Sequence, residues 1–175
     1  MDSLLEILSV DTEAVTKTIK KKEILQKQGI VSKNAFYVKK GLIRSYSIDE
    51  KGKEHIFMFG SEGWIIADLE SNVFNRPTEL YIDCIEDGEI VSFSLEYFNS
   101  ENLSIEKLRK NSKLLTRRIG SLQRRVIQLM SSSAKERYKI FLETYPHIPK
   151  RIPQKMIASY LGITPEALSK IRGQL

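Results

Sequence analysis

Polar side chains suited to contact with a nucleic acid recur near the carboxyl end of the chain. Glu166, Ser169 and Lys170 share one face of a predicted helix. Thr164 is suited to cap the start of that helix, and Pro165 is suited to its first turn. A helix of this kind fits the major groove, which is about 12 Å wide, with its amino-terminal residues nearest the bases.

A second helix is needed to position this polar face, and residues 154–161 predict such a helix. Ile157, Ala158 and Leu161 have the spacing of a buried helix face, and the small Ala158 suits the point where two helices cross. Gly162 supplies the left-handed turn between the helices. These features predict a helix-turn-helix. A helical hairpin that contacts no nucleic acid is the alternative.

The uneven distribution of charge favours the helix-turn-helix over that alternative. Residues 1–100 contain 12 Lys and Arg against 17 Asp and Glu, whereas residues 101–175 contain 16 against 5. The net charge is therefore −5 for the first part and +11 for the second. This distribution suggests that only the second part meets a polyanion, although a merely solvated basic surface is the alternative.

An apolar row with heptad spacing precedes the helix-turn-helix. Its members are alternately three and four residues apart: Ile105, Leu108, Ser112, Leu115, Ile119, Leu122, Val126 and Leu129. The second member of each pair in this row is leucine, and the first member is β-branched in three of the four pairs. This combination favours a parallel two-stranded coiled coil. We therefore expect these residues to form a homodimer interface. The alternative is one amphipathic helix packed on its own domain, which usually has a broader apolar face.

Short runs of aromatic and β-branched residues, separated by glycines, predict β structure over residues 24–98. The expected strands lie within residues 35–38, 42–48, 55–59, 78–85 and 89–94. Their spacing of about ten residues predicts an antiparallel barrel or jelly roll. Apolar residues between positions 4 and 10 predict a helical lead-in before the strands.

The low cysteine and histidine content excludes several kinds of site. A single cysteine, Cys84, permits neither an internal disulfide nor an iron–sulfur or zinc site with several cysteine ligands. His55 and His147 are far apart in sequence, so we expect no metal, no cofactor and no catalytic site of the cupin type. No apolar stretch reaches the roughly 18 residues of a membrane span, and the amino terminus lacks the features of a secretion signal. We therefore expect a cytoplasmic protein without a membrane partner.

Residues 24–29, 36–44 and 157–171, taken with the order of the predicted elements, resemble the Crp/Fnr family of bacterial transcription regulators. The resemblance implies an α+β fold: an N-terminal antiparallel β jelly roll of the cyclic-nucleotide-binding type, a long dimerisation helix and a C-terminal helix-turn-helix. We expect the sensor domain at residues 1–103, the dimerisation helix at 104–131 and the helix-turn-helix DNA-binding domain at 132–175.

The expected effector pocket departs from the family pattern. Members that bind cyclic AMP hold its ribose and phosphate with a Gly-Glu pair followed by an Arg-Ser or Arg-Thr pair. Here Asp68 is the candidate replacement for the glutamate, while Glu79, which repels phosphate, lies near the place of the missing arginine. Arg76 is a candidate substitute for that arginine, and Trp64 is a candidate apolar lining. We therefore do not expect cyclic AMP to bind in the usual way.

The resemblance also implies roles in the second helix of the helix-turn-helix. Pro165 stands where the family has its usual first-turn arginine, Glu166 matches the family glutamate and Lys170 matches a later arginine. Glu166 can accept from a cytosine amino group, and Lys170 can donate to guanine. The expected contacts to the DNA backbone come from Arg151, Gln154, Lys155, Thr164 and Ser169. Residues 145–152 are too few for the usual two-stranded wing.

These features predict a homodimeric, sequence-specific DNA-binding transcription regulator with an effector-binding domain. Its expected partners are double-stranded DNA and a second copy of the chain, with RNA polymerase and an unidentified small-molecule effector as further candidates. The rival function is a small-molecule-binding jelly-roll protein whose helical tail mediates only protein contacts. Steeply salt-dependent DNA affinity distinguishes the two.

Overall fold

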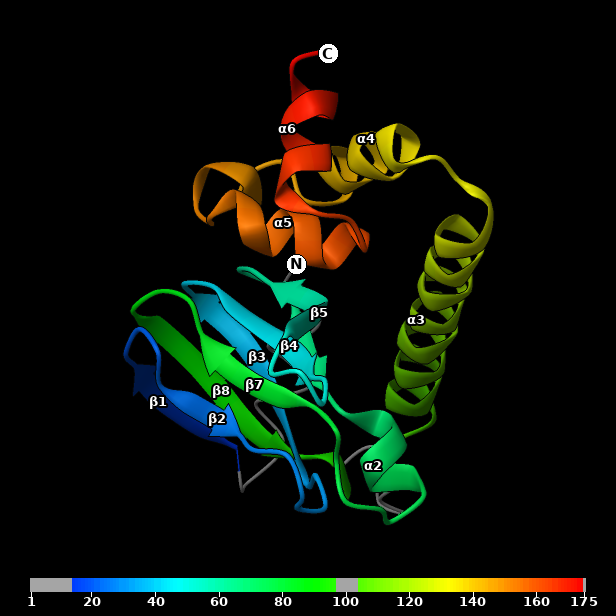
Figure 1. Cartoon of the computed structure of the whole chain (residues 1–175). Coiled ribbons are helices and arrows are strands. Elements are labelled where there is room, and N and C mark those ends of the chain that lie inside the picture. The colour runs from blue at the N-terminus through cyan, green and yellow to red at the C-terminus, as the bar shows by residue number, and fades with distance from the viewer. Residues whose placement is uncertain (1–13, 97–103, 175) are drawn as a thin grey trace. The chain divides into compact units, whose positions relative to one another are not determined.

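A computed structural model describes residues 14–96 and 104–174, so the expected lead-in helix at residues 4–10 lies outside the described residues. The chain divides into two compact units, residues 1–107 and 108–175 (Figure 1). Each unit is described by itself below.

The first unit contains two four-stranded antiparallel sheets, as the sequence predicts for a jelly roll. The first sheet has the order β1-β8-β3-β6, formed by Val15–Ile19, Gly88–Ser94, Asn34–Lys40 and Ile65–Ala67. The second has the order β2-β7-β4-β5, formed by Ile24–Gln26, Tyr81–Cys84, Ile43–Ile48 and Glu54–Gly60. A short helix, α2 (Leu69–Val73), follows β6.

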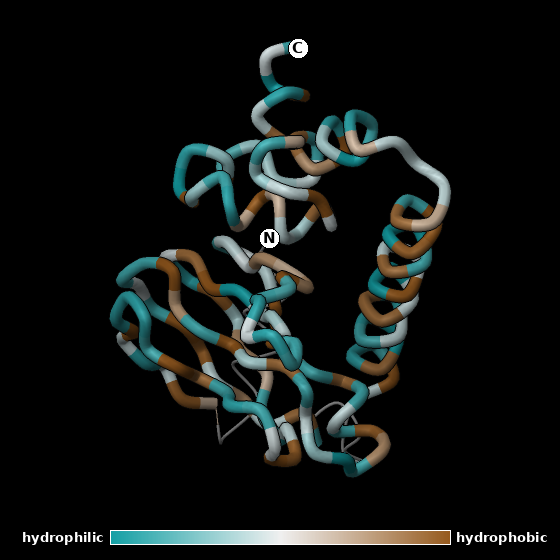
Figure 2. The backbone as a smooth tube through the Cα atoms, in the orientation of Figure 1, coloured by the Kyte–Doolittle hydropathy of each residue, from teal (hydrophilic) through white to brown (hydrophobic). Residues whose placement is uncertain are grey.

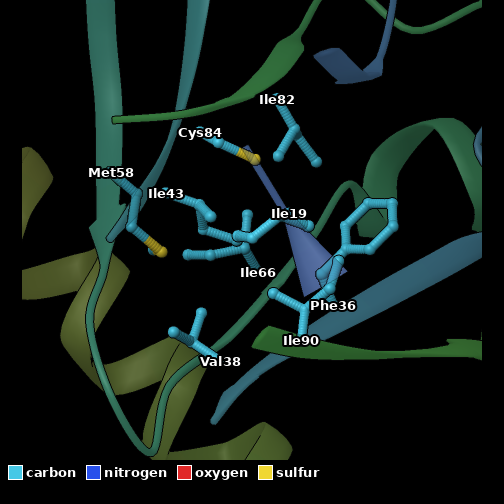
Figure 3. Close-up of a cluster of buried hydrophobic side chains, with 9 residues drawn as sticks. All are labelled: Ile19, Phe36, Val38, Ile43, Met58, Ile66, Ile82, Cys84 and Ile90. Carbon is cyan, nitrogen blue, oxygen red and sulfur yellow. The ribbon is translucent and has the colours of Figure 1, made fainter. Parts of the chain in front are cut away.

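The core of this unit lies between the two sheets, because both contribute side chains to one buried cluster (Figure 3). The cluster consists of Ile19, Phe36, Val38, Ile43, Met58, Ile66, Ile82, Cys84 and Ile90. Burial of this apolar surface, at about 25 cal/mol per Å², is the main force that holds the sheets together. The sulfur of Cys84 lies among these side chains (Figure 3).

Two glycines allow the turn after β3 to pass close to the start of β8. Gly41 has a φ of +100°, and a Cβ atom there would lie 2.9 Å from the carbonyl oxygen of Asp87. A Cβ on Gly88 would collide with the carbonyl oxygen of Lys40. Neither position accepts a side chain without a shift of the backbone, so both glycines are required by the fold.

A buried arginine connects three segments of the second sheet. The Nε and Nη2 atoms of Arg44 donate to both carboxylate oxygens of Asp83 at 2.8 and 2.9 Å, and Nη1 donates to Glu54 at 2.6 Å. Burial alone lowers the pKa of Arg44, but these two carboxylates raise it above its usual value. The guanidinium also lies 4.0 Å from the ring centroid of Tyr46, which stacks on Tyr81. The cation is therefore fixed by charge and by planar contact.

The second unit is helical. The long helix α3 (Ile105–Ser131) is followed by α4 (Ala134–Thr144), the 3-10 helix η2 (Ile148–Lys150), α5 (Gln154–Leu161) and α6 (Pro165–Arg172). Ser133 begins α4 with a reciprocal cap: its hydroxyl accepts from the backbone N–H of Glu136, whose carboxylate accepts from the Ser133 N–H. No helix in the described part of the chain is both long and apolar enough to cross a bilayer.

We expect the loss of Arg44 to destabilise the protein strongly. Arg44→Met leaves the carboxylate of Asp83, a side chain only 14% exposed, without its cation. Removing one partner of a buried pair costs about 3–5 kcal/mol in the free energy of unfolding, measurable by urea denaturation. Lys20→Met is the control, because it removes only an exposed ion pair with Asp87 and should change little. Equal effects of the two substitutions would contradict this assignment.

Candidate nucleic-acid interface and sensor site

The two helices α5 and α6 form the expected helix-turn-helix. Gly162 ends α5 in the left-handed conformation, with φ 67° and ψ 35°. Its N–H donates to the carbonyl of Ser159 at 3.1 Å, and the N–H of Ile163 donates to that of Ala158 at 3.0 Å. These bonds close the carboxyl end of α5 and turn the chain into α6.

The start of α6 is capped as the sequence predicts. The hydroxyl of Thr164 accepts from the N–H of Ala167 at 3.2 Å, and Pro165 occupies the first helical position. The pKa of Glu166 is lowered by its own backbone N–H and by the Thr164 hydroxyl, so its carboxylate is an acceptor at neutral pH. The first turn of α6 therefore carries an ionised carboxylate.

One face of α6 is buried and the other is open. Leu168 is fully buried, whereas Glu166, Ser169 and Lys170 are exposed. Side chains at 166, 169 and 170 lie on neighbouring rows of the helix, so all three can reach one groove. We call this exposed face, formed by Glu166, Ser169 and Lys170, the reading face.

Three residues expected to contact the DNA backbone differ in exposure. Gln154 and Lys155 are exposed in the first turn of α5, whereas Arg151 is half-buried. The chain between α4 and α5 forms η2, and residues 104–174 contain no strand. The two-stranded wing is thus absent from the described part of this unit. Ile148 of η2 is buried, so the connection packs into the helical core.

The heptad row on α3 is largely open to solvent on a single chain. Figure 2 shows hydrophobic residues recurring along this helix. Ser112 is exposed and Leu122 is half-buried, and the other six residues have exposed fractions of 44–72%: Ile105, Leu108, Leu115, Ile119, Val126 and Leu129. We call these eight residues the seam. An apolar row of this length is typical of a surface that another helix covers.

In the first unit, Asp68 belongs to a buried polar network. One carboxylate oxygen accepts from the N–H of Ser71 at 3.1 Å and caps α2, and the other accepts from the hydroxyl of Thr78. Gln26 donates to the Thr78 hydroxyl at 3.2 Å and accepts from the Ser32 hydroxyl at 2.7 Å. All five residues are buried. Both oxygens of Asp68 therefore already have partners within the fold.

The other three candidate pocket residues lie differently. Arg76 and Glu79 are exposed, and Trp64 is half-buried. Arg76 joins the network through its backbone, since its carbonyl oxygen accepts from the Ser71 hydroxyl at 2.6 Å. Its guanidinium lies 5.7 Å from the ring centroid of Phe74. The structure thus links Asp68 and Arg76 through Ser71, and Asp68 is the only charged residue of the four that is buried.

Comparison with known proteins shows what the chain is similar to. Residues 16–101 match the family model of the cyclic nucleotide-binding domain. The chain is 25% identical over 170 residues to the electron transport regulator A of Shewanella oneidensis, covering 90% of this chain and 67% of the relative. It is 26% identical over 171 residues to the fumarate and nitrate reduction regulatory protein of Yersinia pestis, with the same two coverages. The chain is thus similar to regulators of the Crp/Fnr type.

Solved structures of other proteins have the same fold. FixK2 from Bradyrhizobium japonicum superposes with a TM-score of 0.77 at 19% identity, covering 93% of this chain and 84% of that one. A CRP/FNR family transcriptional regulator from Thermus thermophilus gives a TM-score of 0.71 at 20% identity, covering 92% and 85%. The chain spans about two thirds of the length of its curated relatives, such as 65% of the anaerobic regulatory protein of Haemophilus influenzae. These relatives are named as regulators rather than enzymes.

An iron–sulfur cluster held by several cysteines does not fit this chain. Such a cluster needs several cysteine ligands, and this chain has one. Cys84 is 2% exposed in the core of the roll, and burial raises the pKa of its thiol to about 12. The described residues also contain no group of three or more His, Cys, Asp or Glu side chains that could hold a metal ion.

We expect Cys84 to be inert in the folded protein. With a pKa of about 12, about one thiol in ten thousand is ionised at pH 8, and the side chain is also inaccessible. A chromogenic disulfide reagent should react only when denaturant is added. Ser169→Cys provides the matched control, because its added thiol on the exposed reading face should react at once in the native protein. Similar native rates for both thiols would show that the roll opens readily.

Proposed function

We propose that this chain is a sequence-specific DNA-binding transcription regulator that acts as a homodimer in the cytoplasm. The observation that carries the proposal is the exposed reading face on a capped helix, within a part of the chain whose net charge is +11. Phosphate attraction supplies affinity, and contacts to base edges supply specificity. A helical tail used only for protein contacts would need neither the basic charge nor this polar face.

The dimer follows from the seam. Two parallel copies of α3 would cover each other's exposed apolar residues and place two reading faces around a twofold axis. Such an arrangement recognises a palindrome with half-sites about 34–36 Å apart. The same arrangement would position both helical units to contact RNA polymerase beside the DNA, and we propose that enzyme as a further partner.

We further propose that the β roll responds to an effector other than cyclic AMP. The network around Asp68 uses both carboxylate oxygens, and Glu79 is exposed near the place of the phosphate-binding arginine. A cyclic phosphate would meet a negative charge without a bidentate cation. The effector is then a small molecule or protein recognised without such a phosphate contact.

Binding-site selection from random DNA followed by footprinting tests the dimeric regulator. We expect a palindrome, a log affinity that falls steeply with log salt, and no change in either when cyclic AMP is added. Ile119→Glu should give monomers in sedimentation equilibrium and abolish palindromic binding, because it places a charge in the seam. Arg117→Glu, on an exposed position away from the seam, is the control for dimerisation. Footprinting that shows a single protected half-site, or a DNA affinity that does not depend on salt, would contradict the proposal.

Two lysines should separate specificity from affinity. Lys170→Ala removes a contact to a base edge, so it should relax discrimination at one base position by about 1–3 kcal/mol. Lys155→Ala removes a phosphate contact, so it should weaken binding to all DNA sequences alike. It should also reduce the slope of log affinity against log salt by about one. Affinities for the selected site, its single-base variants and random DNA give both quantities. Equal losses on specific and random DNA for both variants would defeat the assignment.

A further inference from the structure

Two arginines from different helices bind the carboxyl end of α5, where the helix-turn-helix turns. Arg125 of α3 donates through Nη2 to the carbonyl oxygen of Tyr160 at 3.0 Å. Arg137 of α4 donates through Nε to the carbonyl oxygen of Leu161 at 3.1 Å. The last carbonyls of a helix lack partners within it and carry its negative dipole end, so guanidinium donors suit this place.

Arg125 makes a second contact with the same residue. Its Cζ atom lies 3.6 Å from the centroid of the Tyr160 ring, within the range of a cation–π interaction. One guanidinium therefore holds both the side chain and the backbone of Tyr160. Lysine cannot replace it, because an ammonium lacks the planar fork that makes both contacts at once.

Tyr160 is itself held by an aromatic cluster of the helical core. Its ring centroid lies 5.3 Å from that of Phe141 and 5.6 Å from that of Tyr145, the latter edge to face. Phe141 and Tyr145 are buried. A contact with Tyr160 is therefore a contact with the rigid core of the helix-turn-helix and not with a mobile side chain.

The seam continues to the same place. Arg125 directly precedes Val126, a seam residue, and so lies beside the seam. Seam residue Leu129 also lies at the turn, since a Cβ on Gly162 would be 3.9 Å from its Cδ2 atom. Arg137 additionally donates to the carbonyl oxygen of Ser132 at 2.7 Å, which fixes the connection from α3 to α4. The end of the seam thus contacts the carboxyl end of α5 and the turn that leads into α6.

We propose that Arg125 determines the half-site spacing that the dimer accepts, an inference that rests on the proposed function. Once two copies pair along the seam, the distance between their reading faces depends on how each helix-turn-helix is held against α3. Arg125 fixes that orientation through Tyr160. Without it, the helix-turn-helix keeps its own core and its half-site contacts but varies in angle against α3. The dimer then tolerates half-sites at several separations.

A series of palindromes with inserted or deleted central base pairs tests this role. The wild type should bind the palindrome with one half-site separation about tenfold or more tightly than the others. Arg125→Ala should reduce this ratio of affinities to about twofold, a change of about 1 kcal/mol. Arg125→Lys should also broaden the preference, because it keeps the charge and loses the fork. Affinity for an isolated half-site and the dimer mass in sedimentation equilibrium should remain as in the wild type for both variants.

Two matched variants serve as controls. Arg124→Ala removes an adjacent exposed cation from the same helix and should leave the spacing preference unchanged. Tyr160→Phe retains the ring and the backbone carbonyl, so it should also behave as the wild type.

The outcomes separate the two proposals. A wild type without DNA affinity overturns the proposed function. A wild type that binds DNA but shares its spacing profile with Arg125→Ala overturns only the role of Arg125. A variant that loses isolated half-site affinity as strongly as palindrome affinity also overturns that role, because the arginine would then merely stabilise the fold. Broadened spacing at unchanged half-site affinity supports it.

Discussion

The exposed apolar seam is the constraint on which the helical unit depends. A helix of 27 residues with eight Lys and Arg and one Glu has little reason to remain ordered alone, because helices in proteins draw most of their stability from a packed apolar face. The seam is such a face, yet most of it is open on a single chain. Under the proposed function a second copy covers it. Folding of α3 is then coupled to dimerisation, so the stability of the helix depends on protein concentration.

The two kinds of cation in this chain serve different purposes. Arg44, Arg125 and Arg137 each make two or more directed contacts, and each connects segments that are distant in sequence. Lys155 and Lys170 are exposed and carry a mobile point charge. A planar donor can fix an angle between elements, whereas an exposed ammonium adjusts to the atom that it contacts. The arginines thus set the geometry of the fold, and under the proposed function the lysines contact DNA, Lys155 at a phosphate and Lys170 at a base edge.

Local chemistry made the helices predictable, and long-range pairing limited the rest. Thr164, Pro165 and Gly162 act through their immediate neighbours, so the bounds of α5 and α6 follow from the sequence. The buried strand β3 reads as a continuous apolar run because both faces are covered, and alternation gives no signal there. The strands β1, β2 and β6 lie outside the strands that the sequence predicts. The partners of Asp68, such as Gln26 and Ser32, resemble any loop polar residues until the fold brings them together. The contact between Arg125 and Tyr160 spans 35 positions and leaves no pattern.

The arrangement of the roll also limits how a signal can reach the helix-turn-helix. Asp68 is committed to the cap of α2 and Cys84 to the core, so neither is available as a receptor for phosphate or as a metal ligand without local unfolding. A ligand shifts an equilibrium only by its difference in affinity for the two states. The seam and the contact of Arg125 lie on one helix, at neighbouring positions. Under the proposed function, an effector acts on the reading face only if one packing of the seam and the contact of Arg125 stabilise each other.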